Sequence, residues 1–86
     1  MKHFPLEQLN SLATPFYYYD MECLENCVST AIAAASSFDF SIHYAVKANH
    51  NLRILQFMKE KGLGVDCVSE NELQEALNSG FPTSKI

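Results

Sequence analysis

Lys47 is the residue whose chemistry most needs explaining. It follows the segment 40–46, which carries apolar residues on both faces, as a strand in a covered parallel sheet does. Lys47 would therefore stand at the carboxyl end of a strand, where ligands bind in α/β folds. Partial desolvation there would lower the pKa of the ammonium, and the neutral amine could form an imine with an aldehyde. The alternative is an ordinary surface lysine.

Asp66 and His43 are the other candidates around this lysine. Asp66 falls on the next predicted strand, 65–68, and could pair with Lys47 or with a cofactor hydroxyl if it faces the same side. Strand alternation would place His43, Ala45 and Lys47 on one face. The alternatives are that Asp66 caps a nearby backbone N–H and that His43 is a packed core residue.

The cysteines give no sign of a metal centre. Cys23 and Cys27 are one helical turn apart, but no His or Cys partner has zinc-site spacing, so core packing is expected for Cys27. Cys67 has the pattern of a small buried hydrophobe. Because three cysteines suggest no disulfide framework, a reducing, cytoplasmic setting is expected.

The elements that must position these residues alternate along the chain. Helices are predicted over 6–13, 21–35, 52–61 and 70–79, and strands over 16–19, 40–46 and 65–68, with another beginning at 85–86. Asp20 and Ser69 are expected to cap two of the helices, and an asparagine of the loop 49–51 a third. From residue 40 onward strands and helices repeat every ~22 residues, which predicts parallel strands with right-handed crossovers.

Size and charge set limits on this arrangement. The chain has 86 residues, whereas a complete (β/α)8 barrel needs about 250. Its net charge is −4 and it has no basic run, so no nucleic-acid partner is expected. No apolar run approaches the length of a membrane span, so no membrane partner is expected either.

Four ordered motifs resemble the fold-type III pyridoxal-phosphate decarboxylases. Residues 44–49 (Tyr-Ala-Val-Lys-Ala-Asn) are similar to the cofactor-lysine motif of that family, 14–20 to the strand leading into its barrel, 65–69 with Glu72-Leu73 to its second barrel strand and helix start, and 80–86 to the run into its third strand. One departure is Glu70-Asn71, where many members have Gly-Gly. Alanine racemase shares the fold, but its lysine motif continues differently from 50–52 here.

The resemblance implies an α/β fold that is an incomplete (β/α)8 TIM-type barrel. Its first two to three β/α units would occupy residues 20–86. Residues 1–19 would supply an N-terminal helix and strand that pack with the separate β-domain of the family. The end at Ile86 is then expected to be a cut at the start of a strand.

The resemblance also implies a chemistry. Lys47 would be the catalytic residue and hold pyridoxal 5′-phosphate as an imine, with Asp66 beside the cofactor. The most similar branch comprises the diaminopimelate decarboxylases, which implies meso-diaminopimelate as the amino-acid substrate, L-lysine and CO2 as products, and a homodimer. Support of the pocket is expected from four further residues: His43, Ala45, Asn49 and Glu72.

Three alternatives stay open at this point. The first is ornithine, arginine or carboxynorspermidine decarboxylation on the same fold. The second is a barrel protein that binds pyridoxal phosphate without catalysis, and the third is a small α/β module that binds another protein. Since the family takes its pyridine-nitrogen and phosphate-binding residues from later sequence, the 86-residue chain alone is expected to be inactive.

Overall fold

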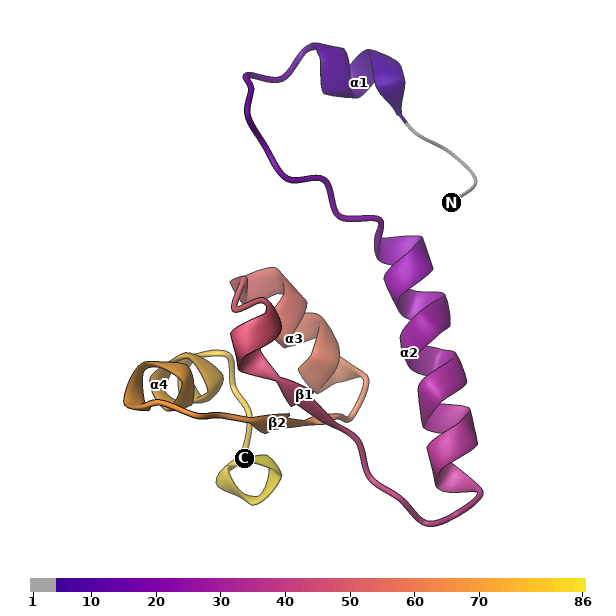
Figure 1. Ribbon diagram of the computed structural model, residues 1–86, viewed down its shortest axis with the longest axis vertical. Helices are drawn as coiled ribbons and strands as arrows, with labels where there is room; N and C mark the ends of the chain where they lie inside the picture. Colours follow the sequence, from indigo (N-terminus) through magenta and orange to yellow (C-terminus); the bar gives the residue numbers. More distant parts are fainter. Residues whose placement is uncertain (1–4) are drawn as a thin grey trace.

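The computed structural model describes residues 5–86 (Figure 1). In chain order its elements are α1 (Leu6–Asn10), α2 (Met21–Ser36), β1 (His43–Ala45), the 3-10 helix η1 (Val46–Ala48), α3 (Leu52–Glu60), β2 (Gly64–Asp66), α4 (Glu70–Asn78) and the 3-10 helix η2 (Thr83–Lys85). Residues 1–4, the start of the predicted segment 1–19, lie outside the described residues.

Strands β1 and β2 form a parallel pair, as the alternating pattern predicts. The register places His43 opposite Gly64, Tyr44 opposite Val65 and Ala45 opposite Asp66. The chain passes from β1 to β2 through α3 and then enters α4, so two β/α units follow one another. The α/β class and the parallel sheet are thereby confirmed.

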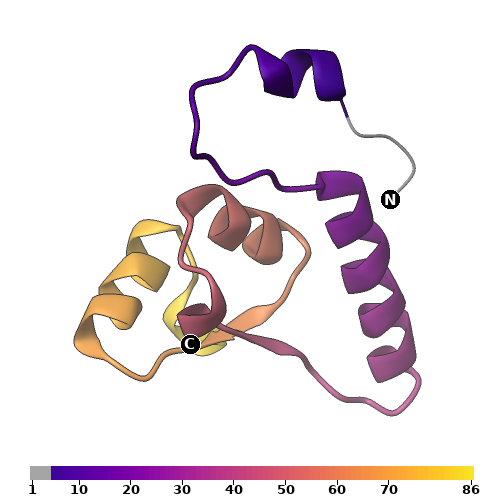
Figure 2. The same ribbon diagram turned by 45° about the horizontal axis from the view of Figure 1, so that its top comes forward.

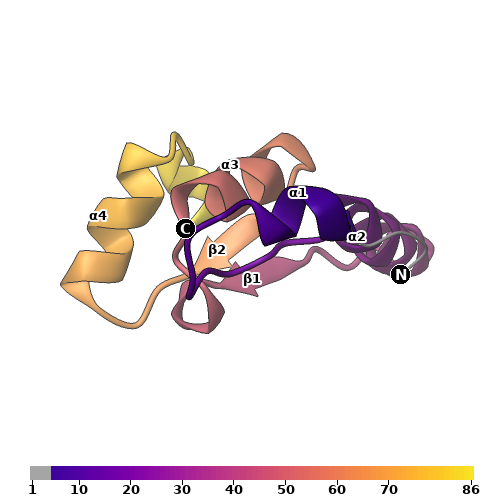
Figure 3. The same ribbon diagram turned by 90° about the horizontal axis from the view of Figure 1, so that it is seen from above.

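The three long helices lie side by side, with the small sheet among them (Figures 1, 2 and 3). Helix α3 lies between α4 and α2 in all three views (Figures 1, 2 and 3). Helix α1 stands apart at the end of an extended segment and buries no residue. The described chain is flat, with extents of 42 × 33 × 17 Å. Within residues 5–86, no helix has the length and apolar character needed to cross a bilayer.

Local signals in the sequence set where the three long helices begin and end. Each begins at a side chain that accepts a backbone N–H: Asp20 from Cys23, Asn51 from Arg53 and Ile54, and Ser69 from Glu72. Helices α3 and α4 end before Gly62 and Gly80, whose φ angles are 87° and 95°. Glycine adopts this left-handed region without the steric cost of a Cβ atom, so both helices stop where predicted.

The hydrophobic core is small and lies mainly between the sheet, α3 and α4. Its buried members are Val28, Val46, Ile54, Leu55, Met58, Leu63, Val65, Ala76 and Phe81. Helix α3 supplies three of them, whereas Val28 is the one buried residue of α2. The unit β1–α3–β2 is therefore the best-packed part of the described chain, and it carries the segment around Lys47.

The strand predicted over 16–19 is absent. The segment is extended, but the sheet of the described chain has two strands and neither pairs with it. Aromatic residues favour a pleated surface, but a strand also needs a neighbouring strand to satisfy its backbone groups. Composition alone therefore overstated the regularity of this segment.

Two of the other strand predictions, over 40–46 and 65–68, locate real strands but give them the wrong ends. The one at 85–86 is wrong. Of the predicted strand 40–46, the residues before His43 are not in the sheet, since the N–H of Phe40 bonds to the carbonyl of Ala35 (3.0 Å) at the end of α2. The strand predicted over 65–68 is β2, one residue earlier at its start. The strand predicted at 85–86 is wrong, because the N–H of Lys85 bonds back to Pro82 (2.9 Å) and coils the chain into η2.

Gly64 is required by the close approach of two neighbours. A Cβ atom built at this position would lie 2.5 Å from ring atoms of His43 and 2.7 Å from the carbonyl oxygen of Lys85. We expect Gly64→Ala to lower the free energy of unfolding by about 1–3 kcal/mol, the usual cost of overpacking. Urea denaturation would measure it. Adding His43→Ala should recover part of the loss, because the ring can be removed and the backbone carbonyl cannot. Full recovery would contradict the role of the carbonyl.

Candidate functional site

Lys47 lies in η1, immediately after the carboxyl end of β1. Its side chain is exposed, and no hydrogen bond or ion pair within residues 5–86 engages its amine. The predicted position at the end of a strand is thus confirmed. The predicted partial desolvation is wrong for the described chain. What the structure provides is an unpaired amine at the edge of the sheet where both parallel strands end.

Asp66 ends β2 and shares this edge. The register sets it opposite Ala45, two residues before Lys47, and its side chain is exposed. The predicted pairing with Lys47 does not occur within residues 5–86, where no ion pair joins the two. The sheet therefore brings an amine and a carboxylate to one edge without neutralising either.

The predicted common face of His43, Ala45 and Lys47 is wrong for Lys47. The strand ends at Ala45, and η1 replaces the alternation of a strand by a tight turn. His43 opens β1, at the far end from the lysine, with its ring close to Gly64. His43 is exposed, so it is neither beside the lysine nor the packed core residue that the alternative described.

Helix η1 carries Lys47 and is called the lysine turn below. Asn49 directly follows it and makes several hydrogen bonds. Its backbone carbonyl accepts the hydroxyl of Tyr44 (2.9 Å), its side-chain oxygen accepts the N–H of Asn51 (2.9 Å), and its amide nitrogen donates to the hydroxyl of Tyr19 (3.1 Å). Sequence reasoning identified Asn49 but missed both tyrosines. The contact of Tyr44 could have been suspected, because its hydroxyl can form a hydrogen bond and the predicted polar loop 49–51 follows shortly after it.

Burial raises the pKa of the Tyr44 hydroxyl above the ordinary tyrosine value, a shift that its hydrogen bond to Asn49 opposes only in part. The protonated form is therefore favoured in the folded state. Its contribution to stability is complete below the ordinary pKa of about 10 and is lost as the pH rises through the higher folded value.

We accordingly expect the free energy of unfolding of the wild type to fall more steeply above about pH 10 than that of Tyr44→Phe, which has no hydroxyl to ionise. Urea denaturation at a series of alkaline pH values would measure both slopes. Tyr17→Phe is the matched control, since Tyr17 is 89% exposed. Equal slopes for the wild type and Tyr44→Phe would refute the expectation.

Glu72 closes the start of α4 and does not reach towards Lys47. Its backbone N–H donates to the hydroxyl of Ser69 (3.2 Å), and its carboxylate accepts the N–H of Val68 (3.0 Å). A standard capping box would return to the N–H of Ser69, so the carboxylate here reaches one residue further back. This arrangement favours the capping role over direct support of a cofactor pocket.

A side-chain contact that the sequence did not suggest joins the loop 49–51 to α4. Nδ1 of His50 lies 2.8 Å from Oε2 of Glu75. The side chain of His50 is 72% exposed. The two residues are 25 positions apart, so nothing in the local pattern pointed to their contact.

The cysteines show no activated thiol. The neighbouring Cys27 raises the pKa of Cys23, first by charge interaction and then by hydrogen bonding, while burial raises that of Cys67. A raised thiol pKa leaves less of the nucleophilic thiolate at neutral pH. Cys67 is half-buried as expected, but Cys27 is exposed and its predicted core packing is wrong. In the part of the chain that is described, no three ligand-type residues gather for a metal ion.

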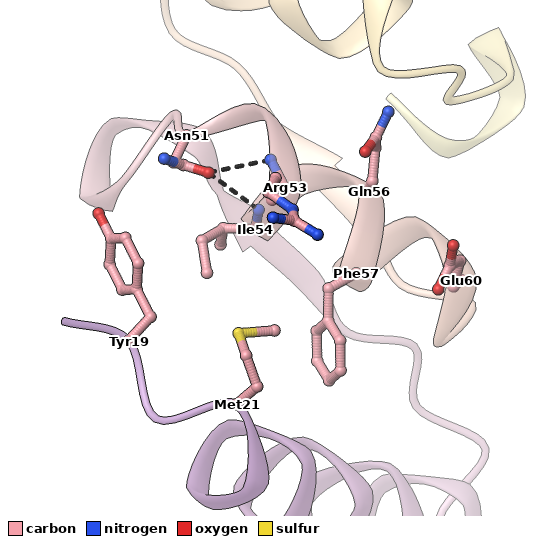
Figure 4. A pocket seen from close by; sticks show the side chains of 8 residues that line it. All are labelled: Tyr19, Met21, Asn51, Arg53, Ile54, Gln56, Phe57 and Glu60. Atoms are coloured by element: carbon pink, nitrogen blue, oxygen red, sulfur yellow. Dashed lines mark hydrogen bonds between the residues drawn. The ribbon is translucent and has the colours of Figure 1, made fainter. Parts of the chain in front are cut away.

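A pocket of about 500 Å³ opens between the start of α2 and the outer side of α3 (Figure 4). Its lining residues are Tyr19, Met21, Asn51, Arg53, Ile54, Gln56, Phe57 and Glu60. The side-chain oxygen of Asn51 caps α3 at one end of it, through the two hydrogen bonds drawn in the figure. The pocket includes neither Lys47 nor Asp66, so it is separate from the edge of the sheet where the amine lies.

Comparisons with known proteins identify the family to which the chain is similar. The family model "Pyridoxal-dependent decarboxylase, pyridoxal binding domain" matches residues 24–86. Proteins named diaminopimelate decarboxylase are similar to the chain: that of Bacteroides thetaiotaomicron is 43% identical over 84 residues (96% of the chain, 22% of the relative), and that of Helicobacter pylori J99 is 39% identical over 80 residues (93% and 20%). That of Methanothermobacter thermautotrophicus is 35% identical over 83 residues (94% and 19%).

The chain thus spans about a fifth of the length of these curated relatives. No solved structure matches it. The matched segment contains β1, the lysine turn, β2 and nearly all of α2, which are the elements that build the site. The chain therefore belongs to the family of pyridoxal-dependent decarboxylases and lies in their pyridoxal-binding domain.

Proposed function

We propose that this chain is the cofactor-lysine part of a decarboxylase that converts meso-diaminopimelate into L-lysine and CO2. One observation carries the proposal: an exposed, unpaired Lys47 amine at the carboxyl edge of a parallel strand pair, inside the segment matched by the pyridoxal-binding family. That edge is where α/β folds bind ligands. The relatives with 35–43% identity are named for this substrate.

The residues present fit pyridoxal phosphate. Lys47 would hold the cofactor through Nζ, since this amine has no partner within residues 5–86. When bound, the cofactor supplies an electron sink for the pair of electrons left by the departing carboxylate. Asp66 would accept a hydrogen bond from a cofactor hydroxyl, and its exposed position on the adjacent strand supports this role.

The finer architecture belongs to the same proposal. The two β/α units would be the start of a (β/α)8 barrel, with residues 1–19 packing against a separate β-domain. The exposed aromatic residues Phe16 and Tyr17 support this arrangement, because apolar surface of this kind is usually covered in a complete fold. We further propose a cytoplasmic homodimer.

The test is a panel of amino acids offered to the whole protein loaded with pyridoxal phosphate. We expect CO2 release from meso-diaminopimelate and much slower release from ornithine, arginine and carboxynorspermidine. Preference for one of these three would move the proposal to another branch of the family. Binding of the cofactor with no CO2 release from any substrate would indicate a non-catalytic barrel and refute decarboxylation.

The 86-residue chain by itself is expected to release no CO2 above background from meso-diaminopimelate. The described residues offer an amine and one carboxylate at the edge of the sheet, with no glycine-rich phosphate loop beside them. Electrostatic preorganisation of the whole site is usually the largest part of catalysis. Carboxyl-labelled substrate would detect residual turnover, and cofactor-dependent release of label would contradict this expectation.

A further inference from the structure

The lysine turn is a short element that cannot hold its own geometry. Helix η1 has three residues, and the hydrogen bond that closes it runs from the N–H of Asn49 to the carbonyl of Val46 (3.1 Å). The position of the Lys47 amine therefore depends on how the two ends of the turn are fixed. The register of β1 fixes the first end, because Ala45 is paired with Asp66.

The second end is fixed by three further hydrogen bonds of Asn49, beyond the one that closes the turn. The hydroxyl of Tyr44 joins Asn49 to β1, and the backbone N–H of Asn51 joins it to the residue that caps α3. The third runs to Tyr19, 30 positions earlier in the chain and outside the β/α units. Asn49 is half-buried, and the bond from Tyr44 is partly buried, whereas those to Asn51 and Tyr19 are exposed.

The bond to Tyr19 is not explained by local folding. Asn51 caps α3 through its own side chain, so the helix does not need the amide group of Asn49. Residues 16–19 belong to no strand, yet Tyr19 lies beside Asn49. A pocket whose lining includes Tyr18, Tyr19, Tyr44 and Asn49 lies where the two segments meet. The hydrogen bond from Asn49 to Tyr19 therefore points to a role in holding the lysine turn in position.

We propose that Asn49 and Tyr19 are positioning residues that together set where the Lys47 amine meets the cofactor aldehyde. This proposal rests on the proposed function and deepens it. The N-terminal segment thereby acts on the site through the side chain of Asn49. A displacement of about 1 Å at a reacting group costs roughly 10²-fold in rate.

The test measures the rate at which the cofactor-free whole protein captures pyridoxal phosphate, followed by absorbance and confirmed by borohydride trapping at Lys47. We expect Tyr19→Phe and Asn49→Ala each to slow capture by about 10- to 100-fold. The double variant should be no slower than Asn49→Ala, since both changes break the same tie. Tyr17→Phe is the matched control, because it removes an exposed hydroxyl from the same segment and should leave capture unchanged.

A second readout separates positioning from a general loss of structure. In the cofactor-free protein, Tyr19→Phe should speed amide hydrogen exchange over residues 46–51 while leaving exchange in α4 and the thermal midpoint unchanged. Capture within twofold of wild type in both single variants, or strictly additive effects in the double variant, would overturn the positioning role. If the wild type itself fails to capture the cofactor at Lys47, the proposed function falls first and this inference with it.

Discussion

Replacing Lys47 by alanine is expected to abolish covalent capture of pyridoxal phosphate and to lower decarboxylation by the whole protein by at least about 10²–10⁴-fold. That range is the usual contribution of a single group that transfers protons, and a lysine that also holds the cofactor should cost no less. The amine has no partner in residues 5–86. Its removal therefore leaves no broken structural contact to complicate the result.

Two controls sharpen this experiment. Lys47→Arg keeps the positive charge but has no amine that can bond to an aldehyde carbon, so it should behave like the alanine variant. Lys85→Ala, which removes an exposed lysine of η2, should retain full capture. Absorbance of the bound cofactor and the release of labelled CO2 are the two measurements. Capture or turnover by Lys47→Ala near the wild-type level would rule out this lysine as the cofactor residue.

Truncating Leu55 to alanine is expected to lower the free energy of unfolding by about 2–5 kcal/mol, the usual cost of emptying a buried leucine site. Leu55 is 1% exposed and lies at the centre of α3, against the core that supports β1 and β2. Because stabilities of native proteins are about 5–15 kcal/mol, this loss is a large share of the total.

The matched control lies on the same helix. Leu52 is 52% exposed, so Leu52→Ala should change the free energy of unfolding by no more than about 0.5 kcal/mol. Urea denaturation followed by circular dichroism gives both values. Equal losses in the two variants would mean that Leu55 is no more deeply packed than Leu52, contrary to the burial described above.

Features that depend on neighbouring residues were predictable from the sequence. Asp20, Asn51 and Ser69 each cap a helix through a donor two or three positions away, and Gly62 and Gly80 act within a single turn. The parallel pairing of the strands also followed from the alternation of strand and helix patterns. The position of Lys47 at the end of β1 followed in turn from that order.

Features that depend on distant partners were not predictable in this way. The aromatic run 16–19 has strand composition, but composition does not say whether a neighbouring strand is present. The bonds from Asn49 to Tyr19 and from His50 to Glu75 span 30 and 25 positions. Each joins exposed or half-buried polar residues, whose spacing carries no periodic signal. The sequence therefore predicted a lysine at the end of a strand. It did not predict the contacts between distant residues that surround this lysine.

The short span of the parallel pair has a consequence for the order of events during synthesis. Partners in β1 and β2 stand only about twenty residues apart, so closing the chain between them loses less entropy than pairing strands from more distant parts of a chain. A ribosome adding about 5–20 residues per second needs a second or more to make that stretch, whereas helices and short loops form in microseconds or less. The lysine turn can thus be assembled as soon as β2 is free to pair with β1, because none of the elements that fix its first end lies later in the chain than β2.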